Sequence, residues 1–85
     1  MCYVYILECS DKTLYTGWTN NLKNRLEAHL KGNGAKYTRT RLPVKLVYFE
    51  HHHDKKSAQK RERYIKKMSR SQKLRLIHNF NIHPR

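Results

Sequence analysis

Acidic side chains are scarce in this chain of 85 residues, which has 6 Asp and Glu against 19 Lys and Arg. The formal net charge is therefore +13, and the calculated pI is near 10.2. Like charges at this density repel one another in the compact state, so they stabilise nothing internally. A phosphate backbone is the partner that suits them, because each neutralised phosphate releases a condensed counterion. An anionic membrane surface is the alternative partner.

Long apolar runs and cysteines are also scarce. The longest wholly apolar stretches are only a few residues long, so no segment is expected to span a bilayer. Residues 1–8 are typical of a strand rather than of a secretory signal peptide. The only cysteines, Cys2 and Cys9, are an odd number of residues apart and would face opposite sides of one strand. We therefore expect two free thiols in a soluble, cytoplasmic protein.

The length predicts one domain over residues 1–85, with its core at about 2–78 and a short C-terminal tail. No internal repeat, linker or low-complexity tract interrupts it. Residues 2–8 and 13–19 are rich in β-branched and aromatic side chains, and turn-forming residues lie between them. This pattern predicts a β-hairpin.

A helix is predicted after the hairpin. Asn20 or Asn21 is expected to cap its first turn, and Gly32 is expected to follow its last residue, near Lys31. A leucine at every fourth position supplies its apolar stripe. These leucines are Leu22, Leu26 and Leu30.

The second half predicts one more strand and two more helices. Residues 34–42 are basic and irregular, with room for one helical turn, and Pro43 ends them. A strand over 44–50 follows, then a helix over about 55–67 capped by Asp54. Ser69-Arg70-Ser71-Gln72 resembles a capping box for a last helix that carries Leu74, Ile77 and Phe80. The order ββαβαα predicts an α/β (α+β) domain with a small three-stranded antiparallel sheet flanked by helices.

Glu62 is the acidic residue whose position is most informative. At about 100° per residue, Glu62 lies about 40° from Ala58, close to the apolar stripe that includes Ile65. A carboxylate that faces the sheet must be paired or bound to a cation, because burying a bare charge is costly. An ion pair with a nearby Lys or Arg meets this need. A Mg²⁺ ion meets it too, since that ion takes one or two carboxylates and keeps several waters.

Arg25 and His29 lie four residues apart on the first predicted helix, at one edge of its leucine stripe. We expect both at the rim between core and solvent. Arg offers a rigid fork for phosphate oxygens, and His exchanges a proton near neutral pH. A solvated helix edge is the alternative interpretation of this pair.

Tyrosine is frequent, with six residues in the chain. Tyr3 and Tyr5 share one face of their strand, and Tyr15 joins them if the hairpin register is even. Gly17 interrupts the second strand, where a glycine often marks close approach by a backbone or a ligand. Ordinary packing of strand aromatics explains the tyrosines equally well.

The segment from Gly34 to Arg41 interleaves cations with an aromatic ring. This composition suits phosphate contact together with base stacking, and a solvated loop is the alternative. Consecutive histidines at 51–53 cannot all face one ion from an extended chain, so we do not expect a zinc site there. The residues expected to contact nucleic acid are Gly17, Lys36, Tyr37, Arg39, Arg41 and Lys66.

Taken in order, these residues resemble the GIY-YIG nuclease superfamily over about 2–78. Tyr5 stands as the tyrosine of the first motif, and Tyr15-Thr16-Gly17 stands where the second motif belongs. Arg25 and His29 match the arginine of the next helix and the polar residue one turn later, and Glu62 matches the metal-binding glutamate. The segments 34–39 and 43–48 are most similar to the small stand-alone bacterial members.

The sequence departs from the family pattern in two places. Tyr3 occupies the position of the first motif's glycine, a position at which many members vary. Catalytic members often carry a late asparagine, and Asn79 is the only candidate for it. Stand-alone members also lack the attached DNA-binding domain of larger relatives, so the charge of this chain would have to hold the substrate.

The resemblance implies a metal-dependent endonuclease that acts on DNA, including branched or damaged DNA. Glu62 would hold one Mg²⁺ or Mn²⁺ ion, and Arg25 would neutralise charge on the phosphoryl oxygens. Tyr5 or Tyr15, with His29, would orient or deprotonate the attacking water. A monomer that prefers DNA to RNA and needs no small-molecule cofactor is expected.

Two other functions remain open at this level. A basic nucleic-acid-binding module could keep the fold without catalysis, although it would not need Glu62 to face inward. A basic protein of ribosomal or membrane-surface type would bind without any dependence on Tyr5, Tyr15, Arg25, His29 or Glu62.

Overall fold

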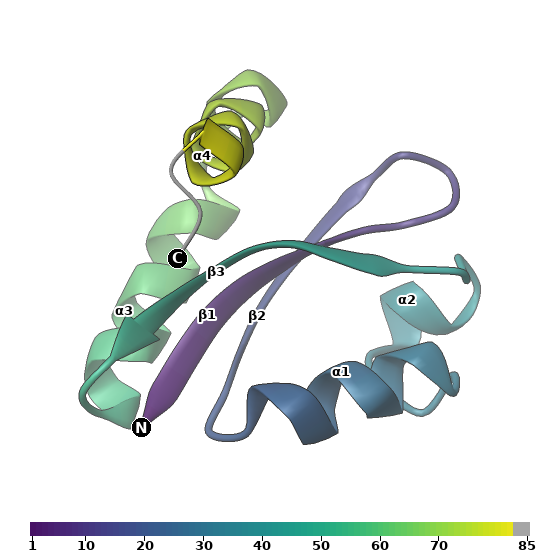
Figure 1. Ribbon diagram of the computed structural model, residues 1–85, viewed down its shortest axis with the longest axis horizontal. Coiled ribbons are helices and arrows are strands. Elements are labelled where there is room, and N and C mark those ends of the chain that lie inside the picture. The colour runs from purple at the N-terminus through teal and green to yellow at the C-terminus, as the bar shows by residue number, and fades with distance from the viewer. Residues whose placement is uncertain (83–85) are drawn as a thin grey trace.

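A three-stranded antiparallel sheet forms the centre of the computed structural model, which describes residues 1–82 (Figure 1). Strands β1 (Cys2–Glu8) and β2 (Leu14–Thr19) form the predicted hairpin. Strand β3 (Lys45–His52) pairs with the other edge of β1, so the order across the sheet is β2–β1–β3. The predicted fold class is therefore confirmed, and β1 lies at the centre because both neighbours hydrogen-bond to it.

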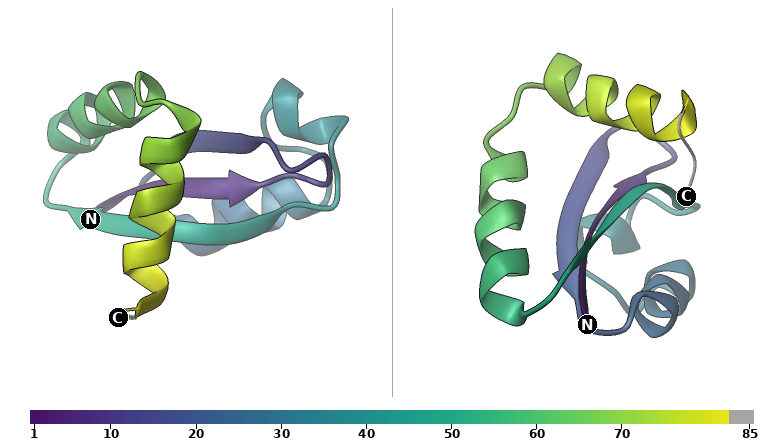
Figure 2. Two further views of the ribbon diagram at one scale, coloured as in Figure 1. Left: turned by 90° about the horizontal axis from the view of Figure 1, so that it is seen from above. Right: turned by 60° about the vertical axis from the view of Figure 1, so that its left-hand side comes forward.

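Helices cover both faces of this sheet (Figure 2). Helix α1 (Leu22–Leu30) and the single turn α2 (Lys36–Arg39) lie on one side, and helix α3 (Lys55–Lys66) lies on the other. Helix α4 (Arg70–Ile82) lies on the same face of the sheet as α3 and crosses its strands. It extends beyond residue 78, the predicted end of the core. Among residues 1–82, no helix has the length and the apolar character needed to cross a membrane.

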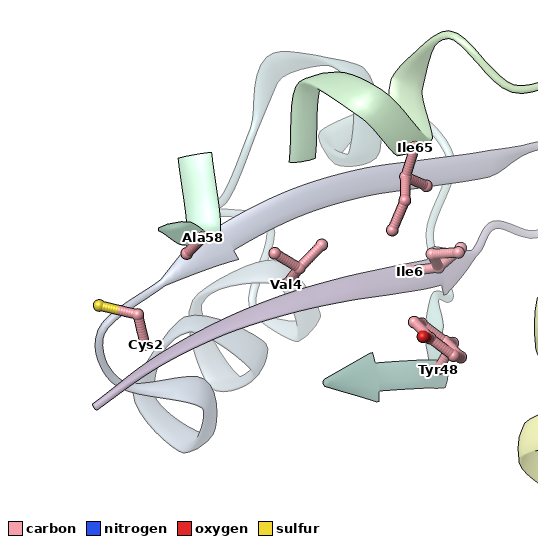
Figure 3. Close-up of a cluster of buried hydrophobic side chains, with 6 residues drawn as sticks. All are labelled: Cys2, Val4, Ile6, Tyr48, Ala58 and Ile65. Atoms are coloured by element: carbon pink, nitrogen blue, oxygen red, sulfur yellow. The ribbon is translucent and has the colours of Figure 1, made fainter. Parts of the chain in front are cut away.

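Alternation along β1 builds one core on each face of the sheet. Val4 and Ile6 are fully buried against Ala58 and Ile65 of α3, in the cluster drawn in Figure 3. Each such side chain contributes about 1.5–3 kcal/mol when it leaves water. The other face of β1 buries Tyr5 and Leu7 beneath α1, in a core that also holds Cys9 just after the strand, whereas Cys2 belongs to the first core. The two cysteines are therefore free and on opposite faces, as predicted.

Helix ends follow the predicted capping signals. Asn21 is the cap of α1, where its side chain accepts a hydrogen bond from the amide of Asn24 at 3.0 Å. The side chain of Asp54 accepts a hydrogen bond from the amide of Ser57 at 2.7 Å and caps α3. Gly32, with φ of +81°, follows α1 in the left-handed conformation that glycine adopts without strain.

The predicted capping box is present at the start of α4. The amide of Ser69 donates to Oε1 of Gln72 at 2.9 Å, and the amide of Gln72 donates to Oγ of Ser69 at 3.2 Å. Each side chain thus satisfies a backbone N–H that has no partner within the helix. This reciprocal bonding fixes where α4 begins.

Three details of the predicted elements are wrong. Leu30 and Leu74 are 51% and 41% exposed, so neither belongs to the apolar stripe of its helix. Helix α1 turns the buried His29 toward the sheet in place of Leu30, and α4 packs through Leu76 and its neighbours. Strand β3 continues to His52 rather than ending at residue 50, because it pairs with β1 as far as Cys2.

A partly buried carboxylate joins β3 to α3. The Glu50 side chain, 14% exposed, accepts hydrogen bonds from Nε of Arg61 at 2.9 Å and from Nε2 of His52 at 2.8 Å. The hydroxyl of Tyr48 donates to its second oxygen. Burial acts to raise the pKa of Glu50, but the hydrogen bonds from Tyr48, His52 and Arg61 outweigh it and hold the pKa below its ordinary value.

Glu50→Gln should lower the free energy of unfolding at pH 7 by about 1–3 kcal/mol, since three donors would compete for one amide oxygen. The folded-state pKa lies below the ordinary value of 4.5, so the carboxylate stabilises the fold above that pH. This contribution is lost as the pH falls below 4.5 and through the folded-state pKa. Urea denaturation at pH 7 and at pH 3 measures both effects. Glu27→Gln, on an exposed side chain, is the control, and equal loss in both variants would contradict the assignment.

Candidate active site at the edge of the sheet

A chain of hydrogen bonds links β1, α1 and α2 inside the protein. The Tyr5 hydroxyl lies 2.9 Å from Nε2 of His29, and Nδ1 of His29 lies 2.9 Å from Oγ1 of Thr38. The Thr38 hydroxyl donates its proton to the carbonyl oxygen of Ala35 at 3.0 Å. Its oxygen must therefore accept from Nδ1–H of His29. This leaves Nε2 to accept the proton of Tyr5, so the network assigns the Nδ1–H tautomer.

Two glycines make room for this pair of rings. Gly17 lies opposite Tyr5 in the β1–β2 register, where a Cβ atom would be 2.6 Å from the Tyr5 hydroxyl oxygen. A Cβ atom on Gly34 would be 2.7 Å from Cγ of His29. Real Cβ contacts of this length essentially do not occur, so a larger residue would displace either ring. The close approach that Gly17 permits is thus that of the Tyr5 ring, under which its backbone is buried.

Both partners of the Tyr5–His29 bond are neutral near pH 7. Burial lowers the pKa of His29 to about 4, and the neighbouring positive charge of Arg25 acts in the same direction. Burial raises the pKa of Tyr5, and the nearby Tyr15 and Glu62 add to the rise while Arg25 opposes it. Tyr15, Glu62 and Arg25 are thus near enough to the Tyr5 hydroxyl to act on its pKa.

The position of His29 corrects the expectation that it lies at the rim. His29 is fully buried, whereas Arg25, one turn earlier on α1, is only partly buried. The difference arises because α2 and the preceding Gly34 close over the imidazole. Sequence reasoning treated residues 34–42 as a basic surface segment, so it missed this cover.

Tyr15 begins a stack of side chains that leads to the surface. Its ring centroid lies 5.5 Å from that of His29 and 6.1 Å from that of Tyr37, with the two tyrosine planes 20° apart. The guanidinium of Arg41 covers the Tyr37 ring at 3.8 Å, and its Nε donates to Asp11 at 3.0 Å. The even hairpin register that places Tyr15 on the face of Tyr5 is therefore confirmed.

Glu62 lies on the flank of α3 that is nearest β2. Its side chain is 17% exposed, and Nζ of Lys66 lies 3.5 Å from one carboxylate oxygen. The predicted inward direction is thus correct, and the expected alternative partner, a lysine ion pair, is present as well. The pair is long and half-exposed at Lys66, so it would contribute little to stability and leaves the carboxylate available to a stronger cation.

A pocket of about 260 Å³ opens beside these residues. It is lined by Leu14, Tyr15 and Thr16 of β2, by Tyr37 of α2, by Lys66 of α3 and by Lys73 of α4. Burial lowers the pKa of Lys73, and the positive charge of Lys66 lowers it further. The Thr16 hydroxyl is buried with no hydrogen-bond partner among the described residues. Lys66 and Lys73 make this pocket suitable for an anion.

A divalent ion fits Glu62 only if water supplies most of its ligands. Within the described residues, His, Cys, Asp and Glu side chains form no group of three or more that could hold a metal. Mg²⁺ accepts such a site, because it usually keeps several waters and takes one or two protein carboxylates. Zn²⁺ in proteins has three or four side-chain ligands, so the donor set does not suit it. Glu62 therefore fits Mg²⁺ or Mn²⁺.

Three other predicted site residues do not line the pocket beside Glu62. Lys36 and Arg39 are exposed on α2, and Asn79 is exposed on α4. Sequence reasoning missed Thr38, Gly34 and Lys73. A threonine after an aromatic residue in a basic segment carries no signal of burial, so only the closing of α2 over His29 identifies Thr38.

This chain is similar to known proteins over almost its whole length. Residues 1–75 match the family model described as the GIY-YIG catalytic domain. A UPF0213 protein of Clostridium perfringens is 63% identical over 82 residues, which cover 96% of this chain and 88% of that protein. Another, from Natronomonas pharaonis, is 52% identical over 75 residues and covers 88% of each chain.

Two solution NMR structures are also similar. That of a UPF0213 protein from Bacillus halodurans is 43% identical with a TM-score of 0.59, and the match covers 92% of this chain and 84% of that one. That of an E. faecalis protein is 36% identical with a TM-score of 0.62, and covers 98% and 88%. The arrangement of sheet and helices is therefore shared with experimentally determined structures.

NMR titration should give His29 a pKa of about 4, and ¹⁵N shifts should show the Nδ1–H tautomer. Between the ordinary value of 6.5 and about 4, the unfolded chain binds a proton at this residue that the folded chain does not. The free energy of unfolding should therefore decrease as the pH falls through that window. His29→Gln should remove this slope, and the exposed His53→Gln controls for the loss of one histidine. Titration near 6.5, or a proton on Nε2, would contradict the network.

Proposed function

The chain belongs to the GIY-YIG family, a nuclease superfamily, and from this membership we propose that it is a divalent-metal-dependent endonuclease that hydrolyses phosphodiester bonds in DNA. One observation carries the proposal. The buried Tyr5–His29 hydrogen bond joins a hydroxyl to a proton acceptor, and the nearby Tyr15, Arg25 and Glu62 all act on the pKa of that hydroxyl. Branched or damaged DNA is included among the proposed substrates.

Tyr5 and His29 would act together on the attacking water. Burial raises the pKa of Tyr5, so its hydroxyl keeps its proton near pH 7 and is a weak base by itself. It can take a proton from water only as its own proton moves to Nε2 of His29. A phosphate bound nearby would favour protonation of His29, because negative charge stabilises the imidazolium. The base would thus gain strength when substrate arrives.

Arg25 and Glu62 would manage the charge of the phosphate. Arg25 is partly exposed close to the Tyr5 hydroxyl, where its guanidinium could bind phosphoryl oxygens as their charge increases. Glu62 would exchange Lys66 for Mg²⁺ or Mn²⁺, and the bound ion would supply further neutralisation of the scissile phosphate. Lys66, released from Glu62, would remain beside the same pocket to contact phosphate.

The nucleic acid would lie across the basic surface that surrounds the pocket. Lys36, Tyr37 and Arg39 on α2 are exposed beside Tyr15, and Arg41 supports Tyr37 from its outer face. These groups suit backbone contact and base stacking, which carry little sequence preference. We propose a monomer that acts on DNA in preference to RNA and needs no small-molecule cofactor. Asn79, exposed on α4, is assigned no role in this mechanism.

A binding module without catalysis is the alternative. It would use the same basic surface, and it would have no need for a proton acceptor behind Tyr5 or for a carboxylate among lysines. The chain has only 6 acidic residues, and one of them faces the pocket side of α3. This arrangement favours the enzyme.

Glu62→Gln should reduce cleavage of supercoiled plasmid or branched DNA by at least about 10²-fold, as expected when preorganised charge stabilisation is lost. The reaction of the wild type should require Mg²⁺ or Mn²⁺ and stop with EDTA. Glu27→Gln carries the same change on an exposed side chain of α1 and should cleave as the wild type does. Salt-sensitive binding without cleavage by all three proteins would support the binding module. Cleavage that survives in Glu62→Gln would point to a contaminating nuclease, and an RNA arm tests the preference for DNA.

Tyr5→Phe should lower the cleavage rate by about 10²–10⁴-fold, the usual contribution of a positioned proton-transfer group. It should also cost about 1–3 kcal/mol of stability, because Nε2 of His29 loses its donor inside the protein. Tyr3→Phe is the matched control on the same strand. Single-turnover cleavage and urea denaturation separate the two effects. Full activity in a folded Tyr5→Phe variant would contradict the role of Tyr5 in proton transfer and would indicate Tyr15 as the base instead.

A further inference from the structure

A second, larger pocket lies against α3 and the end of β3, away from the candidate active site. Its volume is about 520 Å³, and His52, Lys60, Arg61, Arg63, Tyr64 and Lys67 are among its lining residues. At about 100° per residue, Tyr64 is rotated by about 160° from Glu62 around the helix axis. The pocket and Glu62 therefore occupy opposite flanks of α3.

The guanidinium of Arg61 is held in a fixed direction at this pocket. The partly buried Glu50 carboxylate accepts from Nε of Arg61 at 2.9 Å, and the same oxygen accepts from Nε2 of His52 at 2.8 Å. The Arg61 guanidinium also lies 5.3 Å from the centre of the Tyr64 ring. These contacts engage Nε and leave the two terminal Nη groups to bind a ligand. Such preorientation reduces the entropy that binding would otherwise cost.

The pocket has a clear excess of positive charge. Glu50 balances Arg61, but no carboxylate lies within 4.0 Å of Lys60, Arg63 or Lys67 anywhere in residues 1–82. Three positive charges are therefore uncompensated at one site. Tyr64 adds an aromatic ring that is 61% exposed. A large exposed ring beside free cations suits a ligand that carries both phosphate and a planar base.

We propose that this pocket is a second phosphate-binding site, which holds the backbone of a nucleic acid at a distance from the site of cleavage. The fixed Arg61 fork would take phosphate oxygens, Lys60 and Lys67 would supply charge, and Tyr64 would stack on a base or sugar. The identity of the ligand rests on the proposed nucleic-acid function. An acidic peptide could supply charge but no base to stack on Tyr64, so nucleic acid fits the pocket better.

Binding of labelled single-stranded and duplex DNA by the full chain in EDTA, measured by fluorescence anisotropy at several salt concentrations, tests this proposal. Lys60→Gln/Lys67→Gln should flatten the dependence of log K on log salt by about 1.4–1.8 in slope, for two lost phosphate contacts. Lys31→Gln/Lys45→Gln removes the same charge from the far end of the domain and should have a smaller effect. A slope change of equal size in both pairs would overturn the site.

Arg61→Lys separates the oriented fork from simple charge. It keeps the positive charge but loses the Nε bond to Glu50, so binding should weaken by about 10–150-fold, the loss of one charge-assisted hydrogen bond. Arg75→Lys, on the exposed surface of α4, is the matched control. Circular dichroism confirms that each variant is folded. Wild-type affinity in folded Arg61→Lys would overturn the role of the fork.

Three further arms identify the ligand and separate this site from catalysis. Inorganic phosphate should shift the NMR signals of Ser57 and Tyr64 only weakly, and a polyglutamate peptide should bind less tightly than DNA of equal charge. Tighter binding of polyglutamate, lost in Lys60→Gln/Lys67→Gln, would overturn the assignment to nucleic acid. DNA binding that depends on the pocket, in a protein that does not cleave, would support this site while refuting the nuclease. Cleavage by the wild type, together with DNA binding that the pocket variants do not change, would support the nuclease and refute this site.

Discussion

The hydrogen bond between the Tyr5 hydroxyl and Nε2 of His29 is the link through which β1, α1 and α2 are held together inside the protein. Both rings are buried, so an unpaired nitrogen or hydroxyl there would cost about 1–3 kcal/mol. Satisfying His29 on its other side requires Thr38, which in turn requires the turn α2 to close over α1. One side-chain pair thus fixes the positions of β1, α1 and α2 relative to one another.

The same pair determines which small residues the chain must use. Gly17 and Gly34 are two of only three glycines, and each leaves space for one ring of the pair. The third, Gly32, serves a different need, because it takes the left-handed conformation after α1. Packing around Tyr5 and His29 therefore accounts for most of the glycine in the sequence.

Scarcity of acid gives the few carboxylates defined tasks. Glu50 anchors Arg61 and His52, Asp54 caps α3, and Asp11 holds the arginine that covers Tyr37. Two others pair with lysines, and Glu27 is exposed with neither an ion pair nor a capping role among the described residues. Most lysines and arginines in residues 1–82 are consequently left without an ion pair. The positive surface is therefore a consequence of where the acids are used, and it remains free to meet a polyanion.

Sequence patterns were sufficient to predict which strands and helices form, because strand alternation and capping residues are local signals. The hairpin register, the caps Asn21 and Asp54 and the inward direction of Glu62 all follow from residues close in the chain. The predictions that were wrong concerned burial that depends on contacts between segments distant in the sequence. Leu30 has the spacing of a core residue, yet the cover over α1 arrives only with α2, and it covers His29 instead.

The burial of His29 also limits when the candidate site can work. With a pKa of about 4, this imidazole is a poor proton acceptor in the free protein, and the Tyr5 hydroxyl stays protonated. Negative charge brought close to the pair would favour the imidazolium, whereas the fixed cation Arg25 disfavours it. A phosphate bound to Arg25 would therefore raise the pKa of His29 in two ways. Its negative charge would stabilise the imidazolium, and it would offset the positive charge of Arg25. The pair would become basic only with a substrate in place, which links proton transfer to binding across the basic surface of the domain.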